Sequence, residues 1–200
     1  MIRVLLADDE DLIRGALVAL LGLEDDLEVV AEARDGVEAI ALAREFQPDV
    51  CVLDLEMPNA DGIEAAAQIS RSVPTRIVMV TRHARPGVLR RALENKVSGF
   101  VPKSTPAQEL ARVIRDVAAG KRYVDSEIAA AALAANDCPL TARELDVLRL
   151  GRGGEPIARI ATSMGLAQGT VRNYVSTIFA KLNVDSRQEA AQRAWENGWI

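Results

Sequence analysis

The chain has 200 residues, 49% hydrophobic but only 4% aromatic, so it is long enough for one large or two small domains with aliphatic cores. Its net charge of −5 argues against nucleic-acid binding until it is divided by position, because residues 1–138 carry −7 and residues 139–200 carry +2. The two cysteines form neither a disulfide framework nor a metal-ligand spacing, and no long apolar run indicates a signal peptide or membrane span, so we expect a cytoplasmic protein without membrane insertion.

Short apolar runs alternate with helical patterns over the first 120 residues, which is typical of a parallel α/β sheet. Runs without polar residues are expected where helices cover both faces of such a sheet. The expected strands are residues 2–7, 28–33, 50–53, 76–80 and 99–101. The expected helices lie near 11–22, 36–46, 61–71, 86–94 and 106–119.

The end of this pattern predicts a linker. Gly120 is suited to the left-handed position that ends a helix. An Ala-rich stretch at 126–135 predicts a short connecting helix, and the polar and proline residues at 136–139 then break the chain. We therefore predict a first domain over 1–120, a linker over 121–138 and a second domain over 139–200.

The second domain shows only helical patterns. Thr141 and Glu144 have the spacing of a capping box, which predicts the start of a first helix. Pro156, Gln168 and Ser186 indicate the starts of three more. The sequence thus predicts an all-α domain of four helices.

Five polar residues fall at or just after the carboxyl ends of the expected strands. They are Asp8, Asp9, Asp54, Thr81 and Lys103. In an open α/β sheet this edge binds ligands, especially where the strand order reverses. If the first and third strands are neighbours, the three carboxylates converge on one pocket.

The chemistry of these residues favours phosphoryl transfer. Close carboxylates repel one another unless a cation joins them, and Mg²⁺ suits a few carboxylates together with a phosphoryl group. Asp54 could then be the nucleophile, while Lys103 neutralises phosphoryl oxygens and Thr81 donates a hydrogen bond to one of them. Taken singly, each residue also has an ordinary structural role, such as a helix cap or a surface charge. Five of them at one sheet edge favour a functional site.

These residues carry a family resemblance. Together with the 54–58 segment Asp-Leu-Glu-Met-Pro and Asp61-Gly62, they resemble the receiver domain of two-component response regulators. The resemblance implies a doubly wound, flavodoxin-like α/β sheet of five parallel strands in the order 2-1-3-4-5, with Asp54 as the phosphoacceptor. It also implies that Thr81 and Phe100 reorient on phosphorylation. The implied Mg²⁺ ligands are Asp9, Asp54, the backbone carbonyl of Glu56 and, through water, Asp8.

Two positions depart from the receiver pattern. Arg82 stands where the family usually has a small residue, and we predict that it restricts the entry of water or donor and alters the lifetime of the phosphoryl group. Lys96 stands where glycine is usual, and we predict that Asn95 takes the left-handed conformation in its place.

In the second domain, the 164–167 segment Met-Gly-Leu-Ala joins two expected helices by a short turn, as in a helix-turn-helix unit. Ala161 permits close helix approach, Gly165 supplies the turn and Val171 is expected to face inward. Helical hairpins with glycine turns are common, so the turn alone leaves a DNA-binding face and a solvated face equally open. The candidate DNA-contacting residues are Gln168, Thr170, Arg172, Asn173, Ser176 and Lys181. No acidic residue occurs from 168 to 182, and Arg and Asn suit bidentate contacts with bases.

The segments 140–144, 160–161, 170–175, 181–182 and 187–191 resemble the LuxR-type domain of the NarL/FixJ regulators. Tyr174 and Ser176 replace the His and Lys that this family often has, which predicts weaker phosphate contact. Less specific matches at 24–30, 48–51 and 84–87 resemble the branch of regulators that pair with membrane sensor kinases and control lipid desaturation.

The whole pattern predicts a transcription factor and not an enzyme. We expect a sensor histidine kinase to phosphorylate Asp54, followed by homodimerisation and binding to double-stranded promoter DNA. Candidate dimer-face positions are Leu12, Ala16, Val113 and Val117. Two other classes stay open: a phosphatase or phosphotransferase using Glu56 as acid–base, and a phosphorylation-controlled module whose helical tail binds RNA or protein.

Overall fold

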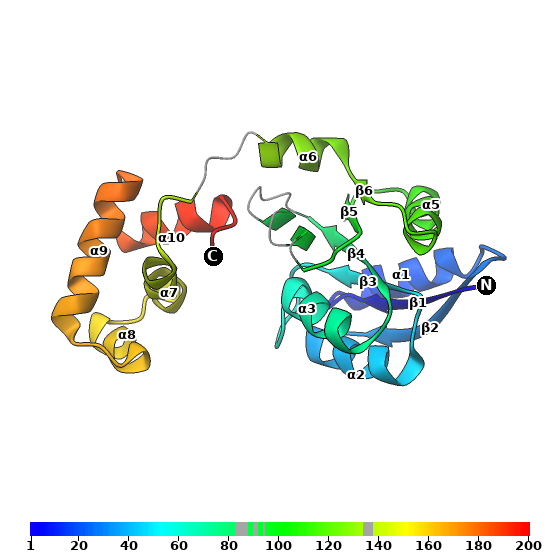
Figure 1. Cartoon of the computed structure of the whole chain (residues 1–200), viewed down its shortest axis with the longest axis horizontal. Coiled ribbons are helices and arrows are strands. Elements are labelled where there is room, and N and C mark those ends of the chain that lie inside the picture. Colours follow the sequence, from blue (N-terminus) through cyan, green and yellow to red (C-terminus); the bar gives the residue numbers. More distant parts are fainter. Residues whose placement is uncertain (83–87, 90–91, 94, 134–137) are drawn as a thin grey trace. The chain divides into compact units, whose positions relative to one another are not determined.

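A computed structural model describes residues 1–82, 88–89, 92–93, 95–133 and 138–200 (Figure 1). The chain divides into two compact units, which we describe separately: an α/β unit whose elements extend to Leu133, and a helical unit whose elements follow residue 138. No helix in these described ranges is long and apolar enough to cross a membrane.

The first unit contains one parallel sheet in the order β2-β1-β3-β4-β5-β6. Its strands are β1 (Ile2–Ala7), β2 (Leu27–Ala33), β3 (Val50–Asp54), β4 (Arg76–Thr81), β5 (Gly99–Pro102) and β6 (Tyr123–Val124). The predicted order 2-1-3-4-5 is confirmed, but the prediction of five strands missed β6, inside the expected linker. A strand of two residues is too short to show the alternating pattern of a strand in the sequence, although Tyr and Val are both frequent in strands.

Helices cover both faces of this sheet (Figure 1). They are α1 (Asp11–Leu21), α2 (Gly36–Phe46), α3 (Gly62–Ser72) and α5 (Ala107–Ala118), while α6 (Ser126–Leu133) contacts β5 near the β6 edge. Helices α1 and α5 contact each other on one face, and α2 and α3 contact each other on the other. The helix predicted over 86–94 lies mostly outside the described residues, and its described positions at 88, 89, 92 and 93 are helical.

The turn after that segment corrects one prediction. Lys96, and not Asn95, adopts the left-handed conformation, with φ of 63°. The amide of Val97 donates to the carbonyl of Ala92 at 3.1 Å, which is the bond that closes a helix when the residue before the donor is left-handed. Because Val97 is buried, its anchoring places the left-handed residue at Lys96.

The hydrophobic core of the first unit corrects the prediction of dimer-face positions. Val113 and Val117 of α5 are fully buried in the cluster that joins α5 to β1, β3 and β4, so they cannot form a dimer face. Leu12 of α1, by contrast, is 86% exposed, and Ala16 is also exposed. Of the candidate dimer-face positions, only those on α1 are accessible.

The second unit is all-helical, as predicted. Its helices are α7 (Ala142–Gly151), α8 (Ile157–Met164), α9 (Gln168–Leu182) and α10 (Arg187–Glu196). Both hydrogen bonds of the capping box between Thr141 and Glu144 are present, and Ser186 caps α10. Gly165 ends α8 in the left-handed conformation, with φ of 65°, and thereby turns the chain into α9.

Candidate functional site

Three of the predicted site residues meet at the carboxyl edge of the sheet. Asp8 follows β1, Asp54 ends β3 and Lys103 follows β5. Nζ of Lys103 lies 2.9 Å from Oδ2 of Asp8 and 2.9 Å from Oδ2 of Asp54. Both carboxylates are buried, with 2% and 3% of their surface exposed. Parallel strands in this order bring these side chains together because their carboxyl ends share one edge.

Glu10 is a fourth member of the site that the sequence analysis missed. Its Oε1 accepts a hydrogen bond from Nζ of Lys103 at 2.9 Å, and its Oε2 forms an ion pair with Arg82. A signal was available, because Glu10 directly follows the Asp8-Asp9 pair in the same loop. One ammonium thus serves three carboxylates.

The electrostatics of the site favour a reactive carboxylate. Burial raises the pKa of Asp54 to about 6, although the hydrogen bond and charge of Lys103 act in the opposite direction. Burial also opposes the charge of Lys103, but its hydrogen bonds to Asp54, Asp8 and Glu10 outweigh that effect and raise its pKa. Hydrogen bonding to Lys103 lowers the pKa of Glu10. At neutral pH the ammonium of Lys103 therefore lies beside the ionised carboxylates of Asp54 and Glu10.

An open cleft of about 240 Å³ leads to Asp54. Its lining residues are Asp9, Glu10, Asp54, Glu56, Arg82 and Lys103. Arg82 thus stands in the wall of the cleft, where its guanidinium is half-exposed and paired with Glu10. Thr81 is fully buried at the end of β4, and Phe100 is buried on the neighbouring strand β5.

The carboxylates also suit a divalent cation. One carboxylate oxygen from each of Asp8, Asp9 and Glu10 lies within 4.8 Å of the others. Hard oxygen donors beside an open cleft are what Mg²⁺ requires, because it keeps several water ligands. The residues present therefore fit this cation.

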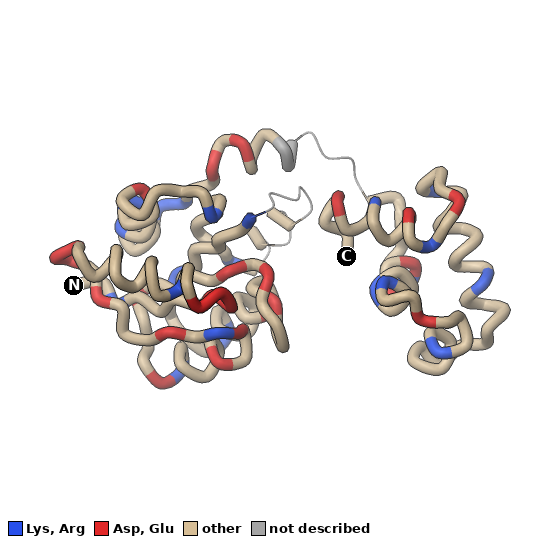
Figure 2. The backbone as a smooth tube through the Cα atoms, turned by 180° about the vertical axis from the view of Figure 1, so that it is seen from behind, with Lys and Arg blue, Asp and Glu red and all other residues tan. Residues whose placement is uncertain are grey.

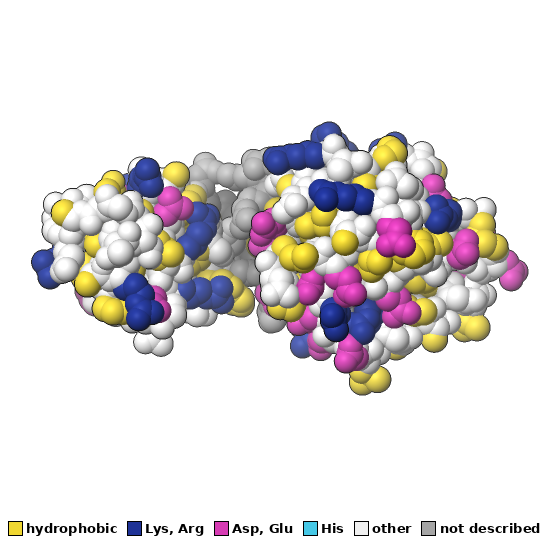
Figure 3. All heavy atoms as spheres, turned by 90° about the horizontal axis from the view of Figure 1, so that it is seen from below, with side chains coloured by type: hydrophobic (Ala, Val, Ile, Leu, Met, Phe, Trp, Pro, Cys, Tyr) yellow, Lys and Arg dark blue, Asp and Glu magenta, His cyan; other side chains and the backbone are white. Residues whose placement is uncertain are grey.

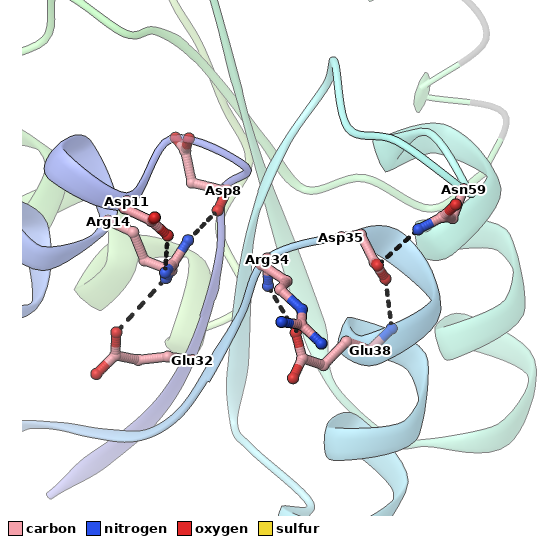
Figure 4. Close-up of polar contacts among 8 residues, drawn as sticks. All are labelled: Asp8, Asp11, Arg14, Glu32, Arg34, Asp35, Glu38 and Asn59. Atoms are coloured by element: carbon pink, nitrogen blue, oxygen red, sulfur yellow. Dashed lines mark hydrogen bonds and ion pairs between the residues drawn. The ribbon is translucent and has the colours of Figure 1, made fainter.

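The loop after Asp54 is held against the neighbouring loop (Figure 4). Asn59, which is left-handed with φ of 65°, donates from Nδ2 to Oδ2 of Asp35 at 2.8 Å. Two glycines permit close backbone approach, because a Cβ on Gly36 would lie 2.2 Å from the carbonyl oxygen of Ala60 and one on Gly62 would lie 2.2 Å from that of Asp54. These contacts hold the loop that follows Asp54.

In the second unit, α9 presents an exposed polar face. Its inward residues Val171, Ile178 and Leu182 are buried. The exposed candidates for DNA contact are Gln168, Thr170, Arg172, Asn173 and Ser176. Helix α9 carries basic but no acidic residues along its backbone (Figure 2). On the face of this unit seen in Figure 3, basic side chains predominate over acidic ones.

Lys181 is exposed like the other candidates, but it also has a partner inside the unit. Its Nζ donates to Oε2 of Glu144 at 2.8 Å, and the Glu144 side chain is 5% exposed. Since Oε2 of Glu144 also accepts the amide of Thr141 at 2.6 Å, Lys181 ties the end of α9 to the start of α7. This ion pair is a structural contact that sequence spacing alone could not reveal.

Comparison with known proteins agrees with these two regions. Residues 4–115 match the family described as response regulator receiver domain, and residues 138–194 match the LuxR family of bacterial regulatory proteins. The chain therefore belongs to the two-component response regulators, in the NarL group that joins a receiver to a LuxR-type DNA-binding domain. These proteins are transcriptional regulators and not enzymes.

Particular relatives support this assignment. The chain is 42% identical over 200 residues, the whole length of both proteins, to the transcriptional regulatory protein DesR of Bacillus subtilis. It is 37% identical over 206 residues, with 98% of this chain and 95% of the relative covered, to the DNA-binding transcriptional activator DevR/DosR of Mycobacterium tuberculosis.

Solved structures agree on the fold. The response regulator ChrA of a heme-sensing two-component system matches with a TM-score of 0.60 at 28% identity, covering 100% of this chain and 98% of that one. The response regulator RcsB in its DNA complex matches with a TM-score of 0.67 over 98% of both chains, and its 24% identity supports the fold alone.

Proposed function

We propose that this response regulator is phosphorylated on Asp54 by a sensor histidine kinase, then dimerises and binds promoter DNA through α9. The observation that carries the proposal is the pairing of buried Asp54 with Lys103, 2.9 Å apart, at the end of an open cleft. A buried nucleophile beside a fixed cation is what transfer of an anionic phosphoryl group requires.

The proposed transfer uses groups that the site already holds. A carboxylate oxygen of Asp54 forms a bond to phosphorus while the bond from phosphorus to the kinase's imidazole nitrogen breaks, and that nitrogen keeps the electron pair. A pKa of about 6 leaves Asp54 mostly ionised at neutral pH, as a nucleophile must be. Lys103 neutralises charge on the phosphoryl oxygens, and the Thr81 hydroxyl donates to one of them.

A bound Mg²⁺ ion would supply further neutralisation of the phosphoryl oxygens. Asp9, Asp54 and the backbone carbonyl of Glu56 are its proposed ligands, with Asp8 acting through water. The grouping of the carboxylates of Asp8, Asp9 and Glu10 supports a cation at this place, and it adds Glu10 to the residues that can face it.

The proposed signal passes from the cleft to a surface. Phosphorylation adds about −1.5 to −2 charge beside Lys103, which biases Thr81 and Phe100 toward a second arrangement. We propose that two copies then pair through α1, because its exposed Leu12 and Leu20 offer apolar surface to a second copy. A symmetric dimer would read a pseudo-palindromic operator.

The DNA contacts are proposed for the exposed face of α9. Arg172 and Asn173 suit bidentate contacts with guanine and adenine, and Gln168 lies in the first helical turn, where free amides can contact phosphate. Thr170 and Ser176 complete the face. Lys181 stays in the proposed set, because its side chain remains partly exposed beside its ion pair with Glu144.

The cellular setting is the finest part of the proposal. We propose a cytoplasmic regulator that serves a membrane-bound kinase and controls genes of lipid desaturation or another membrane-stress response. Its support is the resemblance of residues 24–30, 48–51 and 84–87 to that branch, together with full-length similarity to DesR.

The test compares the wild type with Asp54→Ala in the full-length chain. With a small phosphoryl donor and Mg²⁺, we expect the wild type to dimerise in light scattering and to shift its own promoter fragment at lower protein concentration. Asp54→Ala should do neither. Asp25→Ala, which removes an exposed carboxylate outside the cleft, should behave as the wild type. A response that persists in Asp54→Ala would exclude Asp54 as the trigger.

A further inference from the structure

Arg14 of α1 makes three directed contacts beneath the acidic loop (Figure 4). Its Nη1 donates to the backbone carbonyl of Asp8 at 2.7 Å. Its Nη2 lies 2.5 Å from Oδ1 of Asp11, and its Nε lies 3.6 Å from Oε2 of Glu32 on β2. The side chain is only 16% exposed, so these contacts are partly shielded from solvent.

The contact to Asp8 completes the fixing of that residue. The Asp8 amide donates to the carbonyl of Ala33 at 3.1 Å, its Oδ1 accepts the amide of Glu10 at 2.9 Å, and its Oδ2 pairs with Lys103. The backbone carbonyl is the remaining polar group, and Arg14 holds it. Arg14 is therefore one of four contacts that hold the chain where it leaves β1, and the only one of them made to the Asp8 carbonyl among the described residues.

We infer that Arg14 is the positioning residue of the cation site: it orients the Asp8–Glu10 loop so that the carboxylates face one ion. This inference rests on the proposed function, since it assigns a role toward the proposed Mg²⁺. Arg14 itself is a donor only and binds no cation. Residues that orient metal ligands in this way typically contribute 10- to 100-fold to metal affinity.

The sign of the effect separates positioning from simple electrostatics. Arg14 is a positive charge close to a cation site, so by Coulomb's law alone its removal should tighten cation binding. If its contact to the Asp8 carbonyl sets the loop, its removal should weaken binding. The positioning role and simple electrostatics therefore predict opposite changes in the dissociation constant of the cation.

Arg34 offers a matched control. It is 77% exposed and pairs with Glu38 of α2, away from the acidic loop (Figure 4). Arg34→Ala removes the same charge from the same unit without touching Asp8. A second variant, Arg14→Lys, keeps the charge but loses the planar fork that reaches three acceptors at once.

The experiment measures Mn²⁺ affinity of the full-length chain by electron paramagnetic resonance, with Mg²⁺ competition and thermal unfolding in chelator as a check of folding. We expect Arg14→Ala to weaken Mn²⁺ binding roughly tenfold, Arg14→Lys to weaken it less, and Arg34→Ala to leave it unchanged or slightly tighter. If Arg14→Ala does not fold, Arg14→Lys carries the test, because it keeps the charge and must still bind more weakly than the wild type.

Two failures are distinguishable. Unchanged or tighter binding in folded Arg14→Ala, with a wild type that binds Mn²⁺, would overturn the inference and leave the proposed function intact. A wild type that binds neither Mn²⁺ nor Mg²⁺ would contradict the proposed cation site itself, and the role of Arg14 with it.

Discussion

Both units bury a carboxylate that has a lysine partner: Asp54 in the first and Glu144 in the second are each 3% exposed. Burial raises the pKa of both, but only for Asp54 does it prevail. Glu144 has the ammonium of Lys181 to itself and also accepts the amide of Thr141, so its pKa falls below the usual value. Asp54 shares Lys103 with two other carboxylates, and its pKa rises to about 6.

Desolvation is the largest cause acting on the pKa of both groups, so the difference lies in whether local hydrogen bonds offset it. They do so for Glu144 and do not for Asp54. Glu144 has the partners it needs and holds two helices together. Asp54 shares its ammonium with two other carboxylates and keeps a raised pKa, a perturbation that is typical of functional sites. The two carboxylates should also respond to pH in opposite directions.

The largest expected effect comes from Lys181→Ala. Leaving Glu144 buried without its cation should destabilise the second unit by about 1–3 kcal/mol. Fluorescence reports this unit alone, because both tryptophans of the chain, Trp195 and Trp199, lie in it. Arg159→Ala, which breaks an exposed pair with Glu155, is the control and should change stability by less than about 0.5 kcal/mol. Equal losses of stability in Lys181→Ala and Arg159→Ala would contradict the structural role of the buried ion pair.

Arg172→Ala sharpens the comparison on the same helix. Because Arg172 is exposed and is proposed to contact bases, its loss should weaken specific DNA binding by about 1–3 kcal/mol and leave the unfolding curve unchanged. Fluorescence anisotropy on specific and scrambled duplexes measures the affinity, with the salt dependence recorded for both. If Arg172→Ala instead weakened both duplexes equally, the residue would contact phosphate and not bases.

Asp54→Asn tests the other carboxylate in metal-free protein. A raised pKa means that Asp54 holds its proton more tightly in the folded protein than in the unfolded chain, where its pKa is near 3.8. The ionised carboxylate therefore destabilises the folded state, and this destabilisation grows as the pH rises from about 4 through 6. The amide should therefore stabilise the first unit by about 1–2 kcal/mol at pH 7.5, and the gain should vanish near pH 4. Calorimetry in chelator measures it.

The lowered pKa of Glu144 has the reverse sign. Its contribution is present above the unfolded value near 4.5 and is lost as pH falls through the folded value. Acid should therefore lower the free energy of unfolding of the second unit, while protonation of Asp54 removes a destabilising charge from the first. A gain from Asp54→Asn that stayed constant from pH 4 to 7.5 would show that burial of charge is not its cause.

The smallest expected effect is that of Arg82→Ala. Its guanidinium lines the cleft and is paired with Glu10, so its removal should open the approach of water to phosphorylated Asp54. We expect autodephosphorylation to become severalfold faster in a gel assay of the phosphorylated chain. An unchanged rate would remove Arg82 from the account of phosphoryl lifetime.

Much of the fold and of the candidate site was predictable because it depends on pattern. Apolar runs separated by helical periods predict a parallel sheet, and polar residues after those runs must share its edge, which is why Asp8, Asp54 and Lys103 could be grouped before any coordinates. Capping residues such as Thr141 and Ser186 predict helix starts because their hydrogen bonds are local.

The remainder depended on contacts that sequence spacing does not encode. Glu10 joins the cleft because its loop turns it toward Lys103, and Lys181 turns to Glu144, which is 37 positions away in the chain. The left-handed residue is Lys96 and not the predicted Asn95, because a buried Val97 sets the end of the helix. In each case a tertiary contact selected one of several conformations or partners that the local sequence allows equally well.

The central claim is that Asp54 is the residue that takes up the phosphoryl group, and peptide mass spectrometry of the phosphorylated full-length chain tests it most directly. After treatment with a small phosphoryl donor and Mg²⁺, we predict modification of the peptide that contains Asp54, at that residue, and none in Asp54→Ala. A phosphoryl group found on Asp8, Asp9 or any residue outside the cleft, with Asp54 unmodified, would contradict the account.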